Sequence, residues 1–365
     1  MPIYMDLHIL PGVKAKDVAD AHMMDTMMEE EHHCKCMTYW IDEVRGHVFC
    51  LIDAPHKDVV TELHNKSHGL VPHKIIEVQT SLVEAFLGRV NDPEDAELTD
   101  TGLKLINDPG FRIIMVAMAG DQTLLQHSLG KEKAVELNNM LRNLIRQELV
   151  NFGGKEVEHK ETGLIASFVS AGKAVSCAMA IQEKLYGTEM QDCGLRMGIH
   201  AGEPVTNSEK LFGETIQFAK RLCFIANNLQ VALSSSVIEL VKNENFQTVN
   251  NKIRVLSPQD ENLLNLIINK LEENLHNPSF NVADCCRHMA MSKSQLYRKI
   301  LALSGLSPNE LFRDYKLEKA KELLKKRQYN ISQVTFDTGF SSPSYFTKCF
   351  KKKYGILPLA YLDMQ

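Results

Sequence analysis

The last hundred or so residues contain one pattern twice, and this repetition narrows the choice of folds more than any other feature of the chain. In the first copy, Asn281 can cap a helix that runs through Ala290, and Ser292, after a short turn at Met291, can cap a second helix. In the second copy, a helix over 331–337 is followed by Gly339, which suits a turn that needs positive φ, and then by a further helix. We therefore predict two helix-turn-helix units in an all-α segment over residues 261–365.

Polar and basic side chains gather at the start of the second helix of each unit. At this position a recognition helix meets the base edges and phosphates of double-stranded DNA. The candidate DNA-contacting residues are Ser292, Lys293, Ser294, Gln295, Tyr297, Arg298, Lys299, Ser341, Ser342, Ser344, Tyr345, Lys348, Lys351 and Lys352. Apolar residues of the same helices, such as Leu296, Phe346 and Phe350, are expected in the core.

Charge is divided unevenly along the chain. From Glu261 onward there are 16 Lys and Arg against 10 Asp and Glu, whereas the preceding residues hold 25 against 36. A basic module attached to an acidic body indicates a polyanionic partner for the C-terminal part only.

The stretch GFSSPSYFTKCFKKKYGILPLAY closely resembles the second helix-turn-helix of the AraC/XylS regulators, and the resemblance covers the whole of 261–365. Members of that family place both recognition helices of one polypeptide in successive major-groove segments. The resemblance therefore implies two contacts about one helical turn, or about 10 base pairs, apart. The alternative is a helical protein-interaction module with a solvated basic face.

The first 80 or so residues are rich in metal-binding side chains and are predicted to be strand, helix, strand, strand, helix, strand, a ferredoxin-like α+β order. Nine of the 14 histidines lie within the first 73 residues. Spacing places several on shared faces: Asp6 with His8 on a strand, and His64 with His68 on a helix. Imidazole combined with thiolate or carboxylate suits Zn, Ni, Cu or Fe better than Mg or Ca.

This segment also resembles a small ferredoxin-like family, some of whose members bind nickel. The residues that carry the resemblance are MPIYMDLHILPG, the Ala21-His22 pair, YWIDE, VFCLIDAP and LHNKSHG. The predicted metal ligands are His8, His22, Cys50, His64 and His68, with Asp6 and Asp25 as reserves. An alternative cluster, His32-His33-Cys34-Lys35-Cys36, fits less well, because neighbours in a strand point to opposite faces and the spacing is not that of a zinc ribbon.

Between these two segments, residues 111 to about 241 alternate strands and helices. The stretches GGKEVEHKETGLIASFVSAGKAVSCAMAIQ, LRMGIHAGEPV and LFGETIQFAKRL resemble the catalytic domain of bacterial class III nucleotidyl cyclases. Such enzymes hold a pair of divalent ions with two carboxylates. Aligned with Gly120 as the anchor, the first carboxylate falls on Ala117 and the second on Thr162.

Other positions of the cyclase resemblance also differ. Glu158 stands where the family has a base-reading lysine, and Gln217 stands where it has an asparagine, whereas Arg221 is retained. Asp121 would restore one carboxylate in a shifted alignment, but nothing replaces the one lost at Thr162. The expected role is therefore dimerisation or residual ligand binding rather than catalysis.

The 365 residues suit two or three domains. We predict a ferredoxin-like domain over 1–80, a linker over 81–110, a cyclase-like α/β domain over 111–245, a linker over 246–260 and the DNA-binding module over 261–365. No apolar run reaches the roughly 18 to 20 residues of a membrane-spanning helix, and the first residues lack the pattern of a secretory signal. Nine cysteines, an odd number in a long chain, favour reduced thiols in the cytoplasm.

These features together predict a sequence-specific DNA-binding transcription regulator with an N-terminal sensor. Its partners would be double-stranded DNA and a second copy of the chain, and its effector would be nickel or another transition metal first and a nucleotide second. The main alternative is a nucleotidyl cyclase, or a nucleotide-binding regulator, coupled to a DNA-binding module. A metal buffer that uses DNA as a scaffold ranks last.

Overall fold

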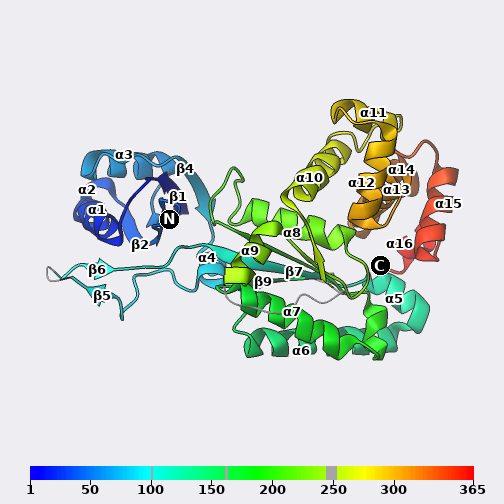
Figure 1. The fold of residues 1–365 in the computed structure, drawn as a ribbon, viewed down its shortest axis with the longest axis horizontal. Coiled ribbons are helices and arrows are strands. Elements are labelled where there is room, and N and C mark those ends of the chain that lie inside the picture. Colours follow the sequence, from blue (N-terminus) through cyan, green and yellow to red (C-terminus); the bar gives the residue numbers. More distant parts are fainter. Residues whose placement is uncertain (100–101, 161–162, 244–252) are drawn as a thin grey trace.

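The computed structural model describes residues 1–99, 102–160, 163–243 and 253–365 (Figure 1). A four-stranded sheet near the N-terminus, a central six-stranded sheet and a C-terminal group of helices follow one another along the chain. The elements therefore follow the predicted order of an α+β segment, an α/β segment and an all-α segment.

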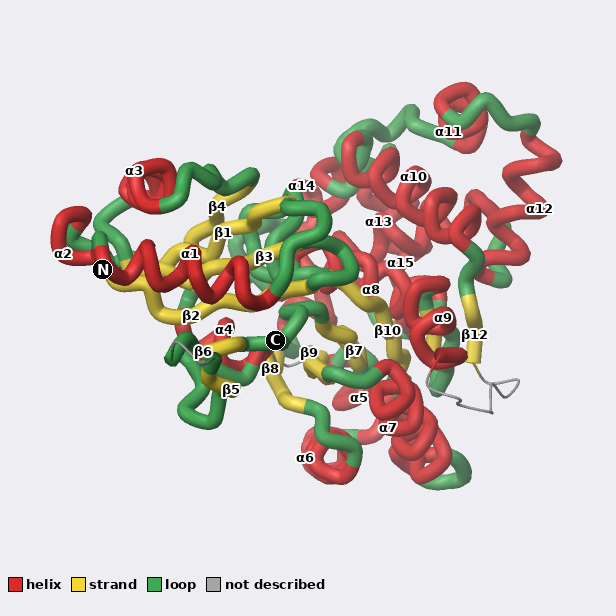
Figure 2. The backbone as a smooth tube through the Cα atoms, turned by 60° about the vertical axis from the view of Figure 1, so that its left-hand side comes forward, coloured by secondary structure: helices red, strands yellow, loops and turns green. Residues whose placement is uncertain are grey.

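The N-terminal elements follow the predicted order, with one additional short helix. They are β1 (Ile3–Ile9), α1 (Ala15–Met27), α2 (Glu29–His32), β2 (Lys35–Asp42), β3 (His47–Asp53), α3 (Lys57–Ser67) and β4 (Lys74–Val78). The strands are antiparallel in the order β2-β3-β1-β4. Figure 2 shows α1 lying across this sheet, with α3 on the same side. Side chains that alternate along β1 thus face either these helices or the other side of the sheet.

The predicted linker over 81–110 contains regular structure. It holds most of α4 (Thr80–Leu87) and a small hairpin of β5 (Glu97–Leu98) and β6 (Lys104–Leu105). Val83, Phe86 and Leu87 are buried, so α4 belongs to the core. The Arg112 guanidinium donates to the Asp108 carboxylate and to the backbone carbonyls of Phe86 and Leu87, which fixes the end of α4.

The central sheet has the order β12-β11-β10-β7-β9-β8. Its strand β7 (Arg112–Met118) is antiparallel to both β9 and β10. The remaining elements are α5 (Gln122–Leu129), α6 (Lys131–Asn151), β8 (Lys155–Lys160), β9 (Gly163–Phe168), α7 (Ala171–Leu185), the 3-10 helix η1 (Glu189–Cys193), β10 (Arg196–Gly202), α8 (Gly213–Ile225), β11 (Val231–Leu233), α9 (Ser235–Asn243) and β12 (Ile253–Val255). Helices α6 and α7 lie on one side of the sheet and α8 on the other (Figure 1).

Both faces of β7 are buried, which joins the N-terminal and central sheets. Residues 113, 115 and 117 pack toward α6 and α7, whereas Ile114 and Val116 pack into a core shared with Met5, Leu7 and Phe49 of the N-terminal sheet. A strand with two covered faces needs an almost continuous apolar sequence, and IIMVAM supplies it.

The C-terminal part consists of seven helices among the described residues. They are α10 (Pro258–Glu273), α11 (Val282–His288), α12 (Lys293–Ser304), α13 (Pro308–Lys325), α14 (Ile331–Asp337), α15 (Pro343–Tyr354) and α16 (Pro358–Asp363). Helix α10 begins three residues before the predicted boundary at Glu261, because Ser257 caps it, Asp260 completes a capping box and Pro258 occupies the first turn. Helix α11 ends before Ala290, which adopts a left-handed conformation with φ 50°.

Candidate metal centre and nucleic-acid interface

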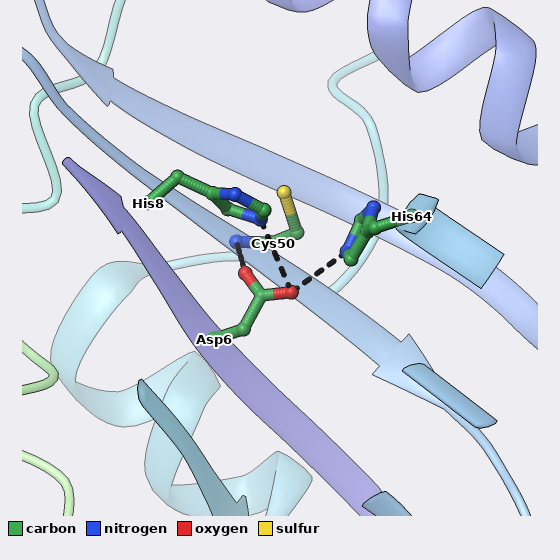
Figure 3. Close-up of side chains that lie close together, drawn as sticks. All are labelled: Asp6, His8, Cys50 and His64. Atoms are coloured by element: carbon green, nitrogen blue, oxygen red, sulfur yellow. Dashed lines mark hydrogen bonds and ion pairs between the residues drawn. The ribbon is translucent and has the colours of Figure 1, made fainter. Parts of the chain in front are cut away.

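Four side chains from three elements of the N-terminal domain converge on one point, and all but the half-buried Cys50 are buried. Asp6 and His8 extend from the same face of β1, Cys50 comes from the neighbouring strand β3, and His64 comes from α3, which covers that face (Figure 3). One ligand atom from each lies within 4.8 Å of the others. The predicted spacing on β1 therefore does place both side chains on the same side of the sheet.

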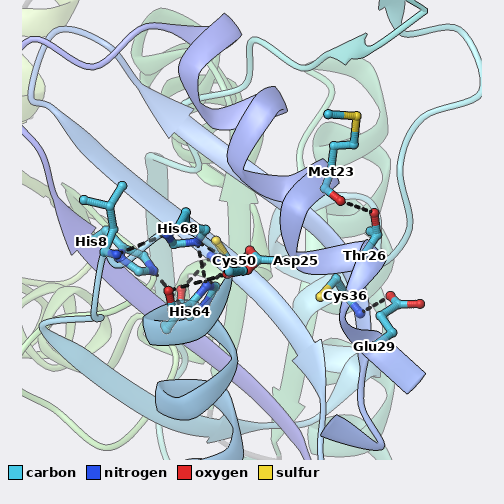
Figure 4. A network of polar contacts seen from close by, with 12 residues as sticks. His8, Met23, Asp25, Thr26, Glu29, Cys36, Cys50, His64 and His68 are labelled. Atoms are coloured by element: carbon cyan, nitrogen blue, oxygen red, sulfur yellow. Dashed lines mark hydrogen bonds and ion pairs between the residues drawn. The ribbon is translucent and has the colours of Figure 1, made fainter. Parts of the chain in front are cut away.

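A second set shares His64 and reaches α1. Asp25, His64 and His68 also have ligand atoms within 4.8 Å of one another. His64 Nε2 lies 2.8 Å from Asp6 Oδ2, and its Nδ1 lies 3.2 Å from Asp25 Oδ2 and 3.0 Å from His68 Nε2 (Figure 4). One imidazole thus links the two carboxylates and connects both sets.

The electrostatics of the centre are dominated by its two carboxylates. Burial alone would favour the neutral form of Asp6, but His8 and His64 outweigh it and hold the pKa of Asp6 well below its ordinary value. Asp25 behaves in the same way, because its hydrogen bonds with His64 and His68 outweigh burial and lower its pKa. Burial lowers the pKa of His64, yet Asp6 and Asp25 together raise it to about 10. Without an ion, His64 is therefore protonated between the two carboxylates, and an ion that binds its imidazole would replace that proton.

The residues present fit a transition-metal ion. His8 is 3% exposed, and its Nε2 is buried without a hydrogen-bond partner, with Asp6 Oδ2 at 3.5 Å. A buried nitrogen of this kind costs free energy unless something else occupies it. Imidazole nitrogens, a thiol and carboxylates together form a donor set that suits Ni, Zn, Cu or Fe.

His22, the remaining predicted ligand, lies outside both sets. Its Nε2 is 3.6 Å from Asp92 Oδ2, and its ring packs on Tyr39 with centroids 5.2 Å apart. Asp25, three residues further along α1, instead reaches His64 and His68 and accepts a hydrogen bond from Ser67 Oγ at 2.5 Å. The structure therefore brings together His8, Cys50, His64 and His68 with both reserve carboxylates.

The alternative His32–Cys36 cluster does not form a comparable group. Within the described part of the chain, none of its members belongs to a set of three close metal ligands. Cys34 and Cys36 pack in a small apolar core with Val60 and Leu63, and the Cys36 N–H donates to Glu29 Oε1 at 2.6 Å (Figure 4). These two thiols therefore lie in an apolar core.

The starts of α12 and α15 present the predicted DNA-contacting side chains to solvent. Of the fourteen residues, all are exposed except Ser342, which is half-buried. Ser292 and Ser342 also cap their helices, since their hydroxyls accept the N–H of Gln295 and Tyr345. Leu296, Phe346 and Phe350, expected in the core, are each 0% exposed. The polar face of each helix is thus free and its apolar face holds it to the module.

The central domain places the residues of the cyclase resemblance in structural roles. Ala117 is 1% exposed on β7, with its side chain in the apolar core beneath α6 and α7, and Thr162 lies outside the described residues. Asp121 Oδ1 caps α5 by accepting the N–H groups of Thr123 and Leu124. The retained Arg221 donates to the side chains of Asn265 and Asn269 on α10. Gln217 and Glu158 line a cavity of about 680 Å³ beside the N-terminal domain.

Comparison with known families identifies the two ends of the chain. Residues 285–364 match the family described as a helix-turn-helix domain, and residues 4–78 match the family described as nickel responsive protein SCO4226-like. The C-terminal part is therefore an AraC-type helix-turn-helix domain, and the N-terminal part is a SCO4226-like domain. None of the described helices is long and apolar enough to span a bilayer.

Individual relatives share only part of their length with this chain. Histidine kinase P4 from Formosa agariphila is 37% identical over 106 residues, which are 29% of this chain and 8% of that protein. The probable transcriptional regulator LumQ from Photobacterium leiognathi is 33% identical over 96 residues, 26% of this chain and 38% of that protein. The chain thus spans well under half the length of either relative. The solved adenylate/guanylate cyclase/hydrolase from Silicibacter pomeroyi is 22% identical, covers 37% of this chain and 81% of its own, and has a TM-score of 0.32.

Proposed function

We propose that the protein is a sequence-specific DNA-binding transcription regulator whose N-terminal ferredoxin-like domain binds Ni²⁺ or a related transition metal as its effector. The observation that carries DNA binding is the pair of exposed, polar recognition helices in a matched AraC-type domain. The observation that supports the metal is the buried cluster of histidine, cysteine and aspartate in a domain matched to a nickel-responsive family.

Our proposal for the central domain is a cyclase-like fold without catalytic activity. The buried Ala117 occupies the position of the first metal-binding carboxylate, and Asp121 is engaged as a helix cap and in a domain contact. We propose a metal-binding domain over 1–80 and a cyclase-like domain over 111–245, as predicted, and we move the start of the DNA-binding domain from Glu261 to Pro258, where α10 begins. We also propose that the protein acts in the cytoplasm as a homodimer.

DNA binding is tested by selecting sequences from a random pool at a fixed salt concentration, with and without Ni²⁺. We expect an enriched motif with two half-sites about one helical turn apart. Arg298→Ala on α12 and Lys348→Ala on α15 should each weaken binding of that motif about tenfold or more. Lys131→Ala removes an exposed charge from α6 and should leave binding unchanged. Unchanged binding in both helix variants would exclude α12 and α15 as the recognition helices.

Metal binding is tested by titrating the purified chain with Ni²⁺ in a calorimeter. His64→Gln should weaken binding at least about a hundredfold, because His64 belongs to both ligand sets. His56→Gln, whose side chain is 62% exposed, is the matched control and should bind normally. His22→Gln should also retain most of the affinity, and a loss as large as that of His64→Gln would mean that α1 turns when the ion binds.

A further inference from the structure

The two helix-turn-helix units are attached to the body of the protein in different ways. The first unit shares an apolar core with the central domain, in which Leu222 and Ile225 of α8 pack with Leu264 and Ile268 of α10. The Arg221 guanidinium adds hydrogen bonds to α10, with Nη1 2.5 Å from Asn265 Oδ1 and Nη2 2.6 Å from Asn269 Oδ1. The first unit is therefore fixed by extensive apolar burial and by directed polar contacts.

The second unit has its own apolar core and meets the central domain at α5 through a small contact. Asp121 Oδ2 accepts hydrogen bonds from Lys325 Nζ and from Tyr361 Oη, each at 2.8 Å. Gln365 Nε2 donates to Thr123 Oγ1 at 2.5 Å, and Leu124 packs against the core of the unit. Figure 1 shows α5 beside α16 at this point. The contact is thus centred on one carboxylate.

That carboxylate is buried and ionised. Asp121 is 5% exposed, and Lys325 outweighs the effect of burial and lowers the pKa of Asp121. Removing one partner of a buried charged pair leaves the other partner unpaired, which costs far more than loss of a surface ion pair. Lys325 ends α13, the helix that joins the two units, and Tyr361 lies on α16. Asp121 therefore contacts both the first and the last helix of the second unit, α13 and α16.

Asp121 is also well placed to respond to the metal-bearing domain. It follows the end of β7 by three residues, and β7 contributes Ile114 and Val116 to the core shared with Met5 and Leu7 of β1. Those two residues alternate along β1 with the metal-centre residues Asp6 and His8. The candidate metal centre and Asp121 are thus linked through one shared apolar core and strand β7.

We propose that Asp121 is a positioning residue for DNA recognition, which acts through Lys325 and Tyr361 to set where the second recognition helix stands relative to the first. The inference rests on the proposed function, because it presumes that both units contact DNA. Two half-sites about one turn apart require the two helices to match that spacing. A unit held in place by Asp121 loses less conformational freedom on binding than one without this contact.

The test uses Asp121→Asn in the full chain, with the DNA sequence that the wild-type protein enriches from a random pool. Asn is an equally good helix cap, so the Oδ1 contacts with α5 survive, but the NH2 group that replaces Oδ2 cannot accept hydrogen bonds from Lys325 and Tyr361. Dissociation constants are measured on three probes, which carry both half-sites, the first unit's half-site alone, or the second unit's half-site alone. The probe with both half-sites should bind about tenfold more weakly to the variant, whereas the first half-site alone should bind with unchanged affinity.

Two further variants keep the result interpretable. Tyr361→Phe removes only the hydroxyl and should give a smaller loss of the same kind, which should not add to that of Asp121→Asn. Asp363→Asn removes an exposed carboxylate from the same helix and should bind all three probes normally. Thermal unfolding of each variant reports whether the chain is folded.

The outcomes separate this inference from the proposed function. Undiminished binding of the two-half-site probe by Asp121→Asn would overturn the positioning role and leave the regulator intact. An equal loss on all three probes would show a general structural role and would also overturn it. If the wild-type chain enriches no sequence at all, the proposed function fails, and this inference fails with it.

Discussion

At the scale of single residues, His200 is a half-buried imidazole away from both candidate sites. It lies on β10, and its ring contacts that of Phe218 edge to face with centroids 4.7 Å apart. Its Nδ1 is buried without a hydrogen-bond partner, and burial lowers the pKa of His200 to about 4. The side chain is therefore neutral in the folded protein at physiological pH.

This burial predicts a pH dependence of stability. An unfolded histidine has a pKa of about 6.5, so between pH 6.5 and 4 the unfolded chain holds a proton at this position and the folded chain does not. Stability should therefore fall as the pH falls through this window, by up to about 1.4 kcal/mol for each pH unit. Urea unfolding at several pH values should show a shallower dependence for His200→Gln than for wild type. His276→Gln changes an exposed histidine, and an identical slope in both variants would contradict the prediction.

The candidate metal centre shows which residue placements follow from the sequence. Asp6 and His8, two apart on a strand, share a face by geometry alone, and so do His64 and His68 on one helix. Spacing predicts equally that His22 and Asp25 share a face, yet only Asp25 reaches the centre. His22 instead lies near Asp92, in the segment after α4, and residue spacing along α1 cannot predict where that segment lies.

At the scale of elements, the turn between α14 and α15 depends on a glycine for two reasons. Gly339 has φ +68°, which side chains rarely adopt, and a Cβ there would overlap the backbone carbonyl of Leu275. Gly355, after α15, has φ +78° but no atom within 4 Å of the Cβ position. The two glycines therefore share a conformation and differ in the space around them.

A pair of substitutions separates these two effects. Gly355→Ala should lower the free energy of unfolding by about 1 to 2 kcal/mol, the cost of a left-handed alanine. Gly339→Ala should cost at least about 1 kcal/mol more, because the backbone at Leu275, just after α10, must also move. Denaturant unfolding of the full chain measures both. Equal losses would show that the contact with Leu275 relaxes freely.

Helix starts in the C-terminal module follow from local chemistry, whereas one helix end does not. Asn281 and Ser292, predicted as caps, accept backbone N–H groups in the structure. Ala290, predicted as the last residue of its helix, instead adopts φ 50° in the turn. Alanine is the strongest helix former, so its propensity gives no sign of a turn, and packing of α12 against α11 overrides it.

At the scale of the whole molecule, the N-terminal and central domains are joined by one core. The sequence predicts each sheet from its own periodicity, but it does not say what covers the second face of β7. An apolar run such as IIMVAM predicts that both faces of the strand are buried, but it does not predict which element buries the second face. Trp40, the chain's one tryptophan, lies in this shared core at 0% exposure. Its fluorescence therefore reports on the junction as well as on the N-terminal sheet.

A ligand that binds the N-terminal domain should consequently stabilise the central sheet. At a free Ni²⁺ concentration about 100 times its dissociation constant, the folded state should gain about 2.7 kcal/mol. Because β1, β3 and β7 share a core, the Trp40 unfolding transition and the hydrogen exchange of β7 amides should be affected together. His64→Gln should abolish both effects, whereas His56→Gln should preserve them. A shift in the Trp40 transition with unchanged exchange in β7 would contradict this prediction. It would show that the shared core opens at the domain junction, so that metal binding stabilises only the N-terminal sheet.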